Sequence, residues 1–273
     1  MNQGLPLLLT FVVCGVLWLI LFAEVTLLNH AGSEPILLQL QWPDILAGMT
    51  IYLKTSIDFA IFIGHLMRTH PGTKNRIAIE CGTAFGNGLG TFLVLALWSF
   101  FRTIDWLLAL MVLLASLVLL KLAEDGLEHA RDEDRRYPRL FRKAVAALER
   151  ILHAINGWIE PVLGRIMPHA TLNTTTVYTW WGLLYFSASI PFILGLDDFA
   201  GYVPLFSIVH VYGFALGVLV GHLVLNLCLF LSPDATIRIV KQPIISFLGS
   251  VAFVGLSLWG LSEVVRIALR AYF

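Results

Sequence analysis

The sequence predicts an all-α protein, a polytopic membrane helix bundle of about seven spans, in which an extra N-terminal helix precedes a 3+3 inverted repeat. Composition is the first indication: 58% of the 273 residues are hydrophobic and 13% are charged, and the mean hydropathy is +0.81. A soluble domain carries about 25% charged residues. The second indication is a series of apolar runs of about 20 residues, the length that crosses the hydrocarbon core as a helix. The third is an internal glycine repeat.

The apolar runs place the expected spans along the chain. Residues 1–6 lack the basic region of a cleaved signal, and the run after them is too long for one, so we expect a retained first helix. The expected spans are Leu5 to Leu28, Asp44 to Met67, Ile77 to Phe101, Trp106 to Leu122, Val177 to Leu196, Tyr202 to Leu231 and Pro243 to Val265.

The loops between these spans alternate in charge, which predicts the orientation. Most Lys and Arg residues lie between spans two and three, four and five, or six and seven, whereas the opposite side holds only Arg102, Arg266 and Arg270. Because basic loops remain in the cytoplasm, we expect an inner (plasma) membrane protein with a cytoplasmic N-terminus and an external C-terminus.

The glycine repeat relates two of the spans. Gly82, Gly86 and Gly90 align with Gly213, Gly217 and Gly221 at a constant offset of 131 residues. Glycine at every fourth position lets helices approach closely, so we expect a helix-packing role for all of these residues. Since the two spans run in opposite directions, the repeat is predicted to be inverted. The expected parts are 1–43 (extra span and external loop), 44–122 (first repeat), 123–176 (cytoplasmic linker) and 177–273 (second repeat).

The linker contains an amphipathic helix. Basic residues accompany a series of apolar residues that recur at helical spacing: Phe141, Val145, Leu148, Leu152, Ile155 and Ile159. We interpret this segment as a helix that lies on the membrane surface, with a regulatory or partner-docking helix as the alternative.

An aspartate in the middle of the second span is the strongest functional signal. An ionised carboxylate at that depth costs roughly 2.5–3.5 kcal/mol, so Asp58 requires a compensating group. Lys54 precedes it by one helical turn, which permits an ion pair. The pair is either structural or a gate in which Lys54 occupies the site when a transported cation is absent.

The other candidates are polar residues in apolar surroundings. Asp197 and Asp198 lie between apolar flanks near Gly195, Gly201 and Pro204, which predict a broken helix whose carbonyls could join a cation site; ordinary loop acids are the alternative. The expected metal ligands are Asp58, Asp197, Asp198, Asn87, His210 and His222. Further residues expected along a transport path are Lys54, Glu80, His65 and Asn226. Glu80 either forms an inner gate or pairs with Arg76, and the pair is the preferred interpretation.

Several functions are not expected. No nucleophile lies beside a base, and the glycine-rich stretch at 82–90 follows no strand, so we expect neither an enzyme nor a nucleotide cofactor. The cysteines at 14, 81 and 228 have no metal or disulfide spacing.

Two short motifs resemble a transporter family. Thr55-Ser56-Ile57-Asp58 is similar to the TNIDD element of cadmium-resistance (CadD-type) transporters, and residues 197–206 resemble their GDNIGIYVPLF element. These transporters belong to the LysE superfamily, which includes a TerC branch. The resemblance implies a three-plus-three fold, export of a metal cation or small solute, and a role for Asp58, Asp197 and Asp198. Phe59 stands where the family has a second Asp, and Asp198 where it has Asn, so cadmium itself is not the expected cargo.

We therefore expect an exporter of a cation, preferably divalent, that works by alternating access and is driven by proton exchange at Asp58. One alternative is a non-transporting subunit or assembly factor of a membrane complex. Another is an exporter of amino acids or organic cations. The expected partners are membrane lipid, the cation, and a homodimer or membrane complex, with no nucleic acid.

Overall fold

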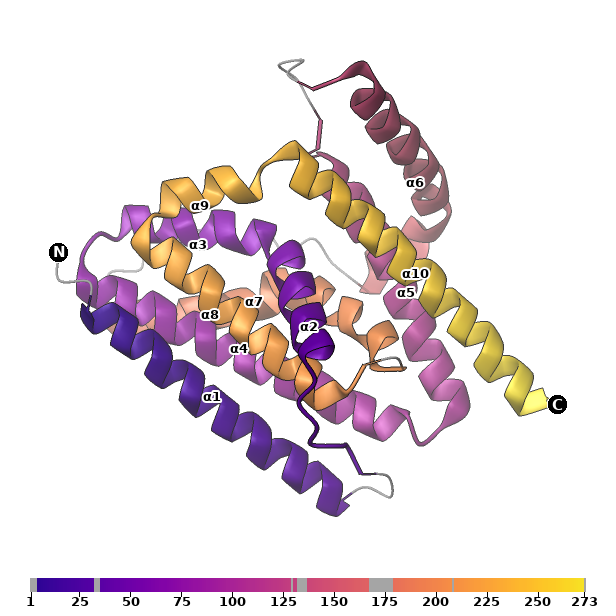
Figure 1. Cartoon of the computed structure of the whole chain (residues 1–273), viewed down its shortest axis with the longest axis horizontal. Coiled ribbons are helices and arrows are strands. Elements are labelled where there is room, and N and C mark those ends of the chain that lie inside the picture. The colour runs from indigo at the N-terminus through magenta and orange to yellow at the C-terminus, as the bar shows by residue number, and fades with distance from the viewer. Residues whose placement is uncertain are drawn as a thin grey trace.

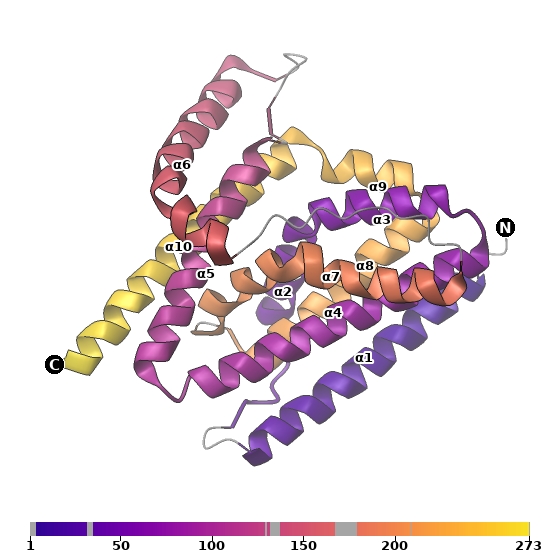
Figure 2. The same ribbon diagram turned by 180° about the vertical axis from the view of Figure 1, so that it is seen from behind.

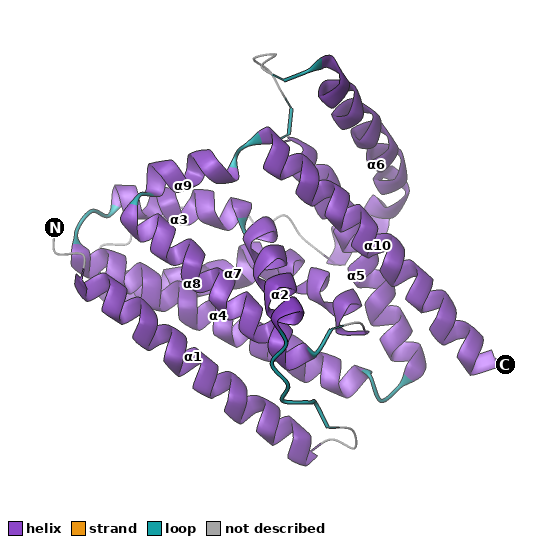
Figure 3. Ribbon diagram, in the orientation of Figure 1, coloured by secondary structure: helices purple, strands orange, loops and turns teal. Residues whose placement is uncertain are grey.

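A computed structural model describes residues 4–31, 35–128, 130–131, 137–166, 179–207 and 209–272, without the side chains of a few residues inside helices. The described residues are helical, with no strand among them (Figure 3). The helices are α1 (Gly4–Ala31), α2 (Trp42–Thr55), α3 (Ile57–Thr69), α4 (Thr73–Phe101), α5 (Asp105–Glu128), α6 (Arg139–Ile166), α7 (Trp180–Tyr202), η1 (Val203–Ser207), α8 (Val211–Leu231), α9 (Pro233–Val240) and α10 (Pro243–Tyr272). The predicted all-α class is thus confirmed for these residues.

Five of the described helices, α1, α4, α5, α8 and α10, are long and apolar enough to cross a membrane. Helices α2 and α3 meet the same criterion only together, as one span bent by 63°. The described residues therefore give five or six spans, where the sequence predicted about seven. The fifth expected span, α7, is helical, but it includes residues whose side chains lie outside the described set, so a seventh span stays a prediction.

The second expected span is not one continuous helix. It breaks at Ser56, between α2 and α3. The Thr55 hydroxyl donates back to the carbonyls of Ile51 and Tyr52. Such back-bonding by Ser or Thr bends helices, which accounts for a bend at this position. Asp58 follows the break, and its side chain lies outside those described.

The break expected near residues 195–201 lies farther along the chain. The backbone is helical as far as Tyr202, and η1 follows at Val203. Helix α8 therefore begins at Val211, whereas the sixth span was expected to begin at Tyr202. The side chains of Asp197 and Asp198 lie outside the described set.

Three helix pairs form the body of the molecule: α4 with α7, α2 with α8, and α5 with α10 (Figure 1, Figure 2). The first two pairs are parallel. Gly82 faces Leu184 and Gly86 faces Ala188 in one pair, and Gly217 faces Ile45 and Gly221 faces Tyr52 in the other. The third pair is antiparallel, with contacts between Ser116 and Ser257 and between Gly126 and Ser250. Helix α1 lies against both α4 and α8.

Glycines permit the close approach within the two parallel pairs. A Cβ at Gly86 would lie 2.1 Å from the Ala188 carbonyl oxygen of α7. A Cβ at Gly217 would lie 2.1 Å from the Ile45 carbonyl oxygen of α2. These two glycines are separated by the 131-residue offset of the sequence repeat, and each faces the backbone of its partner helix.

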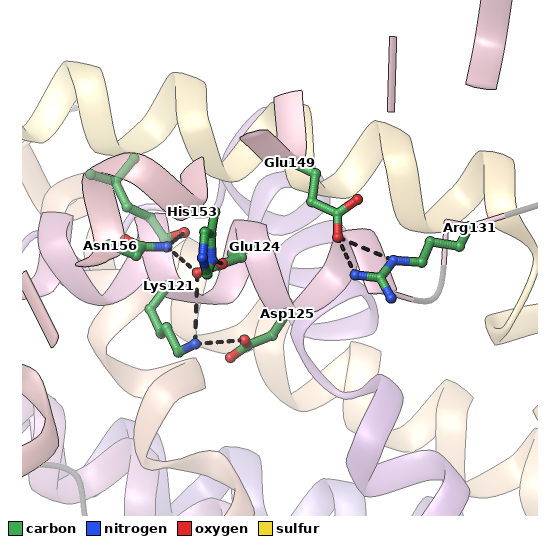
Figure 4. A network of polar contacts seen from close by, with 8 residues as sticks. Lys121, Glu124, Asp125, Arg131, Glu149, His153 and Asn156 are labelled. Carbon is green, nitrogen blue, oxygen red and sulfur yellow. Dashed lines mark hydrogen bonds and ion pairs between the residues drawn. The ribbon is translucent and has the colours of Figure 1, made fainter. Parts of the chain in front are cut away.

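The linker helix α6 packs against protein along the face that was expected to lie on the membrane. Val145 and Leu152 are buried against α5 and α10, and Phe141 contacts Phe247 of α10 edge to face. Polar contacts also join α6 to the end of α5 (Figure 4): Asn156 donates to the Leu120 carbonyl. Asn156 and His153 also bond to Glu124, and Arg131, just after α5, donates to Glu149. Within α5, Lys121 pairs with Glu124 and Asp125.

Candidate functional site

Buried polar side chains gather where α1, α4 and α8 meet. Thr10 of α1, Glu80 and Thr83 of α4, and His222 and Asn226 of α8 are each no more than 4% exposed. These helices otherwise carry mainly apolar residues. Buried polar groups are costly unless they are hydrogen-bonded, so the bonding of each side chain decides what this cluster can do.

Glu80 lies about two turns after the start of α4, and one of its two carboxylate oxygens is hydrogen-bonded. Its Oε1 accepts a hydrogen bond from the Thr10 hydroxyl, while Oε2 has no partner among the described residues. The expected pair with Arg76 is wrong, because the Arg76 guanidinium donates instead to the Phe230 carbonyl and stacks on the Phe230 ring. A buried carboxylate that has no cationic partner among the described residues is therefore present in the bundle.

A chain of hydrogen bonds orients Asn226. The Thr83 hydroxyl donates to the carbonyls of Ile79 and Glu80 in its own helix, so its oxygen can only accept from Asn226. The Asn226 amide nitrogen accordingly lies 3.3 Å from Thr83 Oγ1 and 2.9 Å from His222 Nε2. Its carbonyl oxygen, Oδ1, is left without a partner among the described atoms.

The same chain fixes the state of His222. Because Nε2 accepts from Asn226, the ring proton lies on Nδ1, which donates to the Tyr52 hydroxyl of α2 at 2.6 Å. The imidazole is neutral in this arrangement and uses both nitrogens. His222 therefore links α8 to α2 and presents no free nitrogen to a metal.

A small cavity lies beside these groups. Its volume is about 10 Å3, roughly the space of one water molecule. Thr10, Cys14, Glu80, His222 and Asn226 line it together with apolar residues. The cavity thus combines one acid, one amide and a volume that holds a single small species.

The structure brings together three of the predicted residues, Glu80, His222 and Asn226. His210, His65 and Asn87 lie elsewhere, and the side chains of Asp58, Asp197 and Asp198 lie outside the described set. His210 bonds to Asp44 at 2.9 Å, where α8 and α2 begin, and His65 is exposed on α3. Asn87 is buried in α4, and its amide nitrogen has no partner among the described groups.

Lys54 extends from the end of α2 to another helix. Its ammonium donates to the Ser246 carbonyl of α10 at 2.9 Å. The side chain lies across Gly249, where a Cβ would be 1.5 Å from Lys54 Cε. The pair of Lys54 with Asp58 remains a prediction, but the uninterrupted helix from which it was inferred is broken at Ser56.

Sequence reasoning missed Thr10, Tyr52 and Thr83, and also a second buried acid, Glu24 of α1, whose Oε1 has no partner among the described atoms. Glu24 could have been recognised from the sequence, because an acid near the end of an apolar run is costly. Thr10 gave no such signal. A hydroxyl in a membrane helix usually bonds to its own backbone, and only packing shows that this one reaches Glu80.

These features define the class: an all-helical membrane protein with an acidic, water-sized cavity inside its bundle. No cluster of three or more His, Cys, Asp or Glu suited to a metal ion occurs in the described part of the chain. No family model, curated protein or solved structure matches this chain.

Proposed function

We propose that this protein exports a cation, preferably a divalent metal, by alternating access between two inverted three-helix repeats. The observation that carries the proposal is the pattern of helix pairs. The first repeat comprises the bent α2–α3, then α4 and α5; the second comprises α7, α8 and α10. The first helix of each repeat packs against the second helix of the other: α2 with α8, and α7 with α4.

The pattern of helix pairs stays the same when the first three-helix repeat is interchanged with the second. This interchange maps the α2–α8 pair onto α7–α4, and the third helices, α5 and α10, onto each other. It also maps Gly217 against Ile45 onto Gly86 against Ala188.

The direction of the helices supports an inverted exchange. Helix α1 is parallel to α4, because Thr10 faces Glu80 and Leu17 faces Gly88. It is antiparallel to α8, because Trp18 donates to Tyr212, while Thr10 and His222 line one cavity. Equivalent helices of the two halves therefore run in opposite directions, as in transporters with inverted repeats.

The buried charge supports transport of cations. An ionised Glu80 inside the bundle is unfavourable unless a cation, either cargo or driving ion, accompanies it for part of the cycle. Asp58, beside the α2–α3 break, and Asp197 with Asp198, near the end of α7, occupy corresponding parts of the first helix in each half. We propose that they bind the exported ion, with carboxylate oxygens that suit hard divalent ions such as Mn2+ or Mg2+. The LysE superfamily resemblance supports the same role.

The experiment is metal uptake into everted membrane vesicles that contain the full chain. We expect Mn2+ or another divalent ion to accumulate, and Asp58→Asn to abolish uptake at an unchanged protein level. The control is Asp234→Asn, which removes an exposed ion pair with Arg68 and should leave uptake intact. If Asp58→Asn transports normally, or if no divalent ion moves and the protein instead copurifies with a larger complex, the proposal is wrong.

A second candidate function, export of an amino acid or another organic cation, is favoured by a larger cavity elsewhere. This cavity has a volume of about 170 Å3 and lies between α4, α5, η1 and α10. Arg102 and Arg270 line it together with Asp105 and Glu263, so both charges of a zwitterion could be matched. Uptake of a labelled amino acid that is insensitive to metals would favour this function over metal export.

A further inference from the structure

We infer that Glu80 and Asn226, with Thr10 beside them, form a binding site for one Na+ ion, separate from the proposed cargo site. The role of this ion as the driving ion rests on the proposed transport function. Its binding does not, and can be measured without transport.

The charge of the cavity selects a monovalent ion. When Glu80 is ionised, it carries the only formal charge among the residues that line the cavity, because His222 is held in its neutral form. A single positive charge neutralises it. A divalent ion would leave one uncompensated positive charge in an apolar bundle, which is strongly unfavourable.

The cavity is small and partly open. Its volume of about 10 Å3 is roughly the space of one water molecule. An ion bound there keeps waters on its open side.

The donor atoms select a hard cation. Glu80 and Asn226 are each 1% exposed, and Glu80 Oε2 and Asn226 Oδ1 both lack a partner among the described residues. The Thr83 hydroxyl fixes the Asn226 amide, so Oδ1 cannot be exchanged for a donor without loss of that bond. Two unsatisfied oxygen acceptors on residues that line one cavity suit a hard cation.

The position of the site explains how ion binding would act on transport. Glu80 belongs to α4 and Asn226 to α8, the equivalent helices of the two proposed repeats. An ion between them would favour the arrangement in which these helices hold both oxygens close together. Thr10 adds α1 to the site by orienting the carboxylate.

The test is the thermal unfolding of the purified full-length protein in detergent. NaCl is varied at constant ionic strength with N-methyl-D-glucamine chloride, at several pH values. We expect the Tm to rise with the logarithm of Na+ concentration above the dissociation constant, since a ligand stabilises the state that binds it. Glu80→Gln and Asn226→Leu should abolish this Na+-dependent shift, and Asp234→Asn should retain it. Thr10→Val, a milder change, should weaken Na+ binding several-fold even if the other variants fail to fold.

Two results would overturn the inference: a Tm that responds to pH but not to Na+, which would make Glu80 a proton carrier, or a Na+ shift that persists in Glu80→Gln and Thr10→Val. Na+ binding without metal uptake would refute the proposed function alone. Metal uptake without Na+ binding would refute only this inference.

Discussion

Gly249 of α10 lies directly beneath the side chain of Lys54 from α2. A Cβ at Gly249 would be 1.5 Å from Lys54 Cε and 1.9 Å from Cδ. The lysine thereby crosses from the bent second span to α10, where its ammonium donates to Ser246. The Lys54 side chain therefore connects the bent α2–α3 segment to α10.

Gly249→Ala is expected to push the flexible Lys54 side chain aside and break its bond to the Ser246 carbonyl, which should destabilise the protein by about 1.5–3 kcal/mol, the usual contribution of a hydrogen bond from a charged group. In the Lys54→Ala background the same change should cost much less, because the group that it clashes with is gone. Thermal unfolding of the wild type, the two single variants and the double variant measures the coupling free energy between residues 54 and 249. Gly255→Ala is the control, since nothing lies within 4 Å of a Cβ at that position of α10. Equal costs at 249 and 255 would contradict the contact.

Gly86→Ala and Gly217→Ala are expected to have similar effects, because each places a Cβ 2.1 Å from a carbonyl oxygen of the facing helix. Backbone cannot move aside as a flexible side chain can, so we expect a loss of about 1–3 kcal/mol or more at either site. The yield and Tm of the folded protein in detergent measure it. Gly15→Ala on α1, where a Cβ meets nothing within 4 Å, should be neutral. If only one of the paired variants is destabilised, the two packing faces are not equivalent.

Tyr52→Phe removes the hydroxyl that receives the His222 Nδ1–H bond. A buried donor left without a partner costs about 1–3 kcal/mol, so we expect a lower Tm without a change in helix content. Tyr185→Phe is the matched control, because Tyr185 is 69% exposed. Equal Tm values for the two variants would show that the bond does not contribute to stability.

The outer face of α6 is expected to contact lipid. Leu140, Ile151 and Trp158 are 81%, 57% and 88% exposed and lie on one stripe, beside Lys143 and Arg150, which can meet anionic headgroups. A nitroxide attached at Trp158→Cys, in a background without the native cysteines and in liposomes, should collide more often with oxygen than with a water-soluble nickel complex. Glu160→Cys, on the polar side of the helix, should show the reverse. A fully aqueous environment at residue 158 would contradict lipid contact.

The sequence predicted the helical class because long apolar runs have few alternatives in lipid, where every backbone group must bond within its own segment. It also predicted an amphipathic helix in the linker from a period of 3.6 residues, since Phe141 and Leu152 repeat on one face, and the structure gives this helix as α6, Arg139–Ile166. The surroundings of this helix were not predictable, because an apolar face packs equally well against lipid and against Phe247 of α10. The bend at Ser56 was missed because back-bonding by Thr55 leaves no trace in hydropathy.

The candidate site was predicted only in part, because its hydrogen bonds join side chains from separate helices. Glu80, His222 and Asn226 were recognisable as polar residues in apolar helices, since such residues are costly and so mark sites of interest. Their partners were not. Arg76 lies one turn from Glu80, a spacing that predicts an ion pair. The Arg76 guanidinium instead donates to the Phe230 carbonyl and stacks on the Phe230 ring.

From the sequence alone came the helices, their approximate ends and the spacing of Gly86 and Gly217, because local hydropathy and small residues at fixed intervals are properties of the chain itself. Only the tertiary structure decided that Thr10 of the N-terminal helix reaches Glu80, and that Asn226 turns its amide nitrogen toward Thr83 and leaves its oxygen without a partner. The physical reason is that hydrogen-bond satisfaction depends on the distance and orientation of atoms from separate helices, and packing sets both.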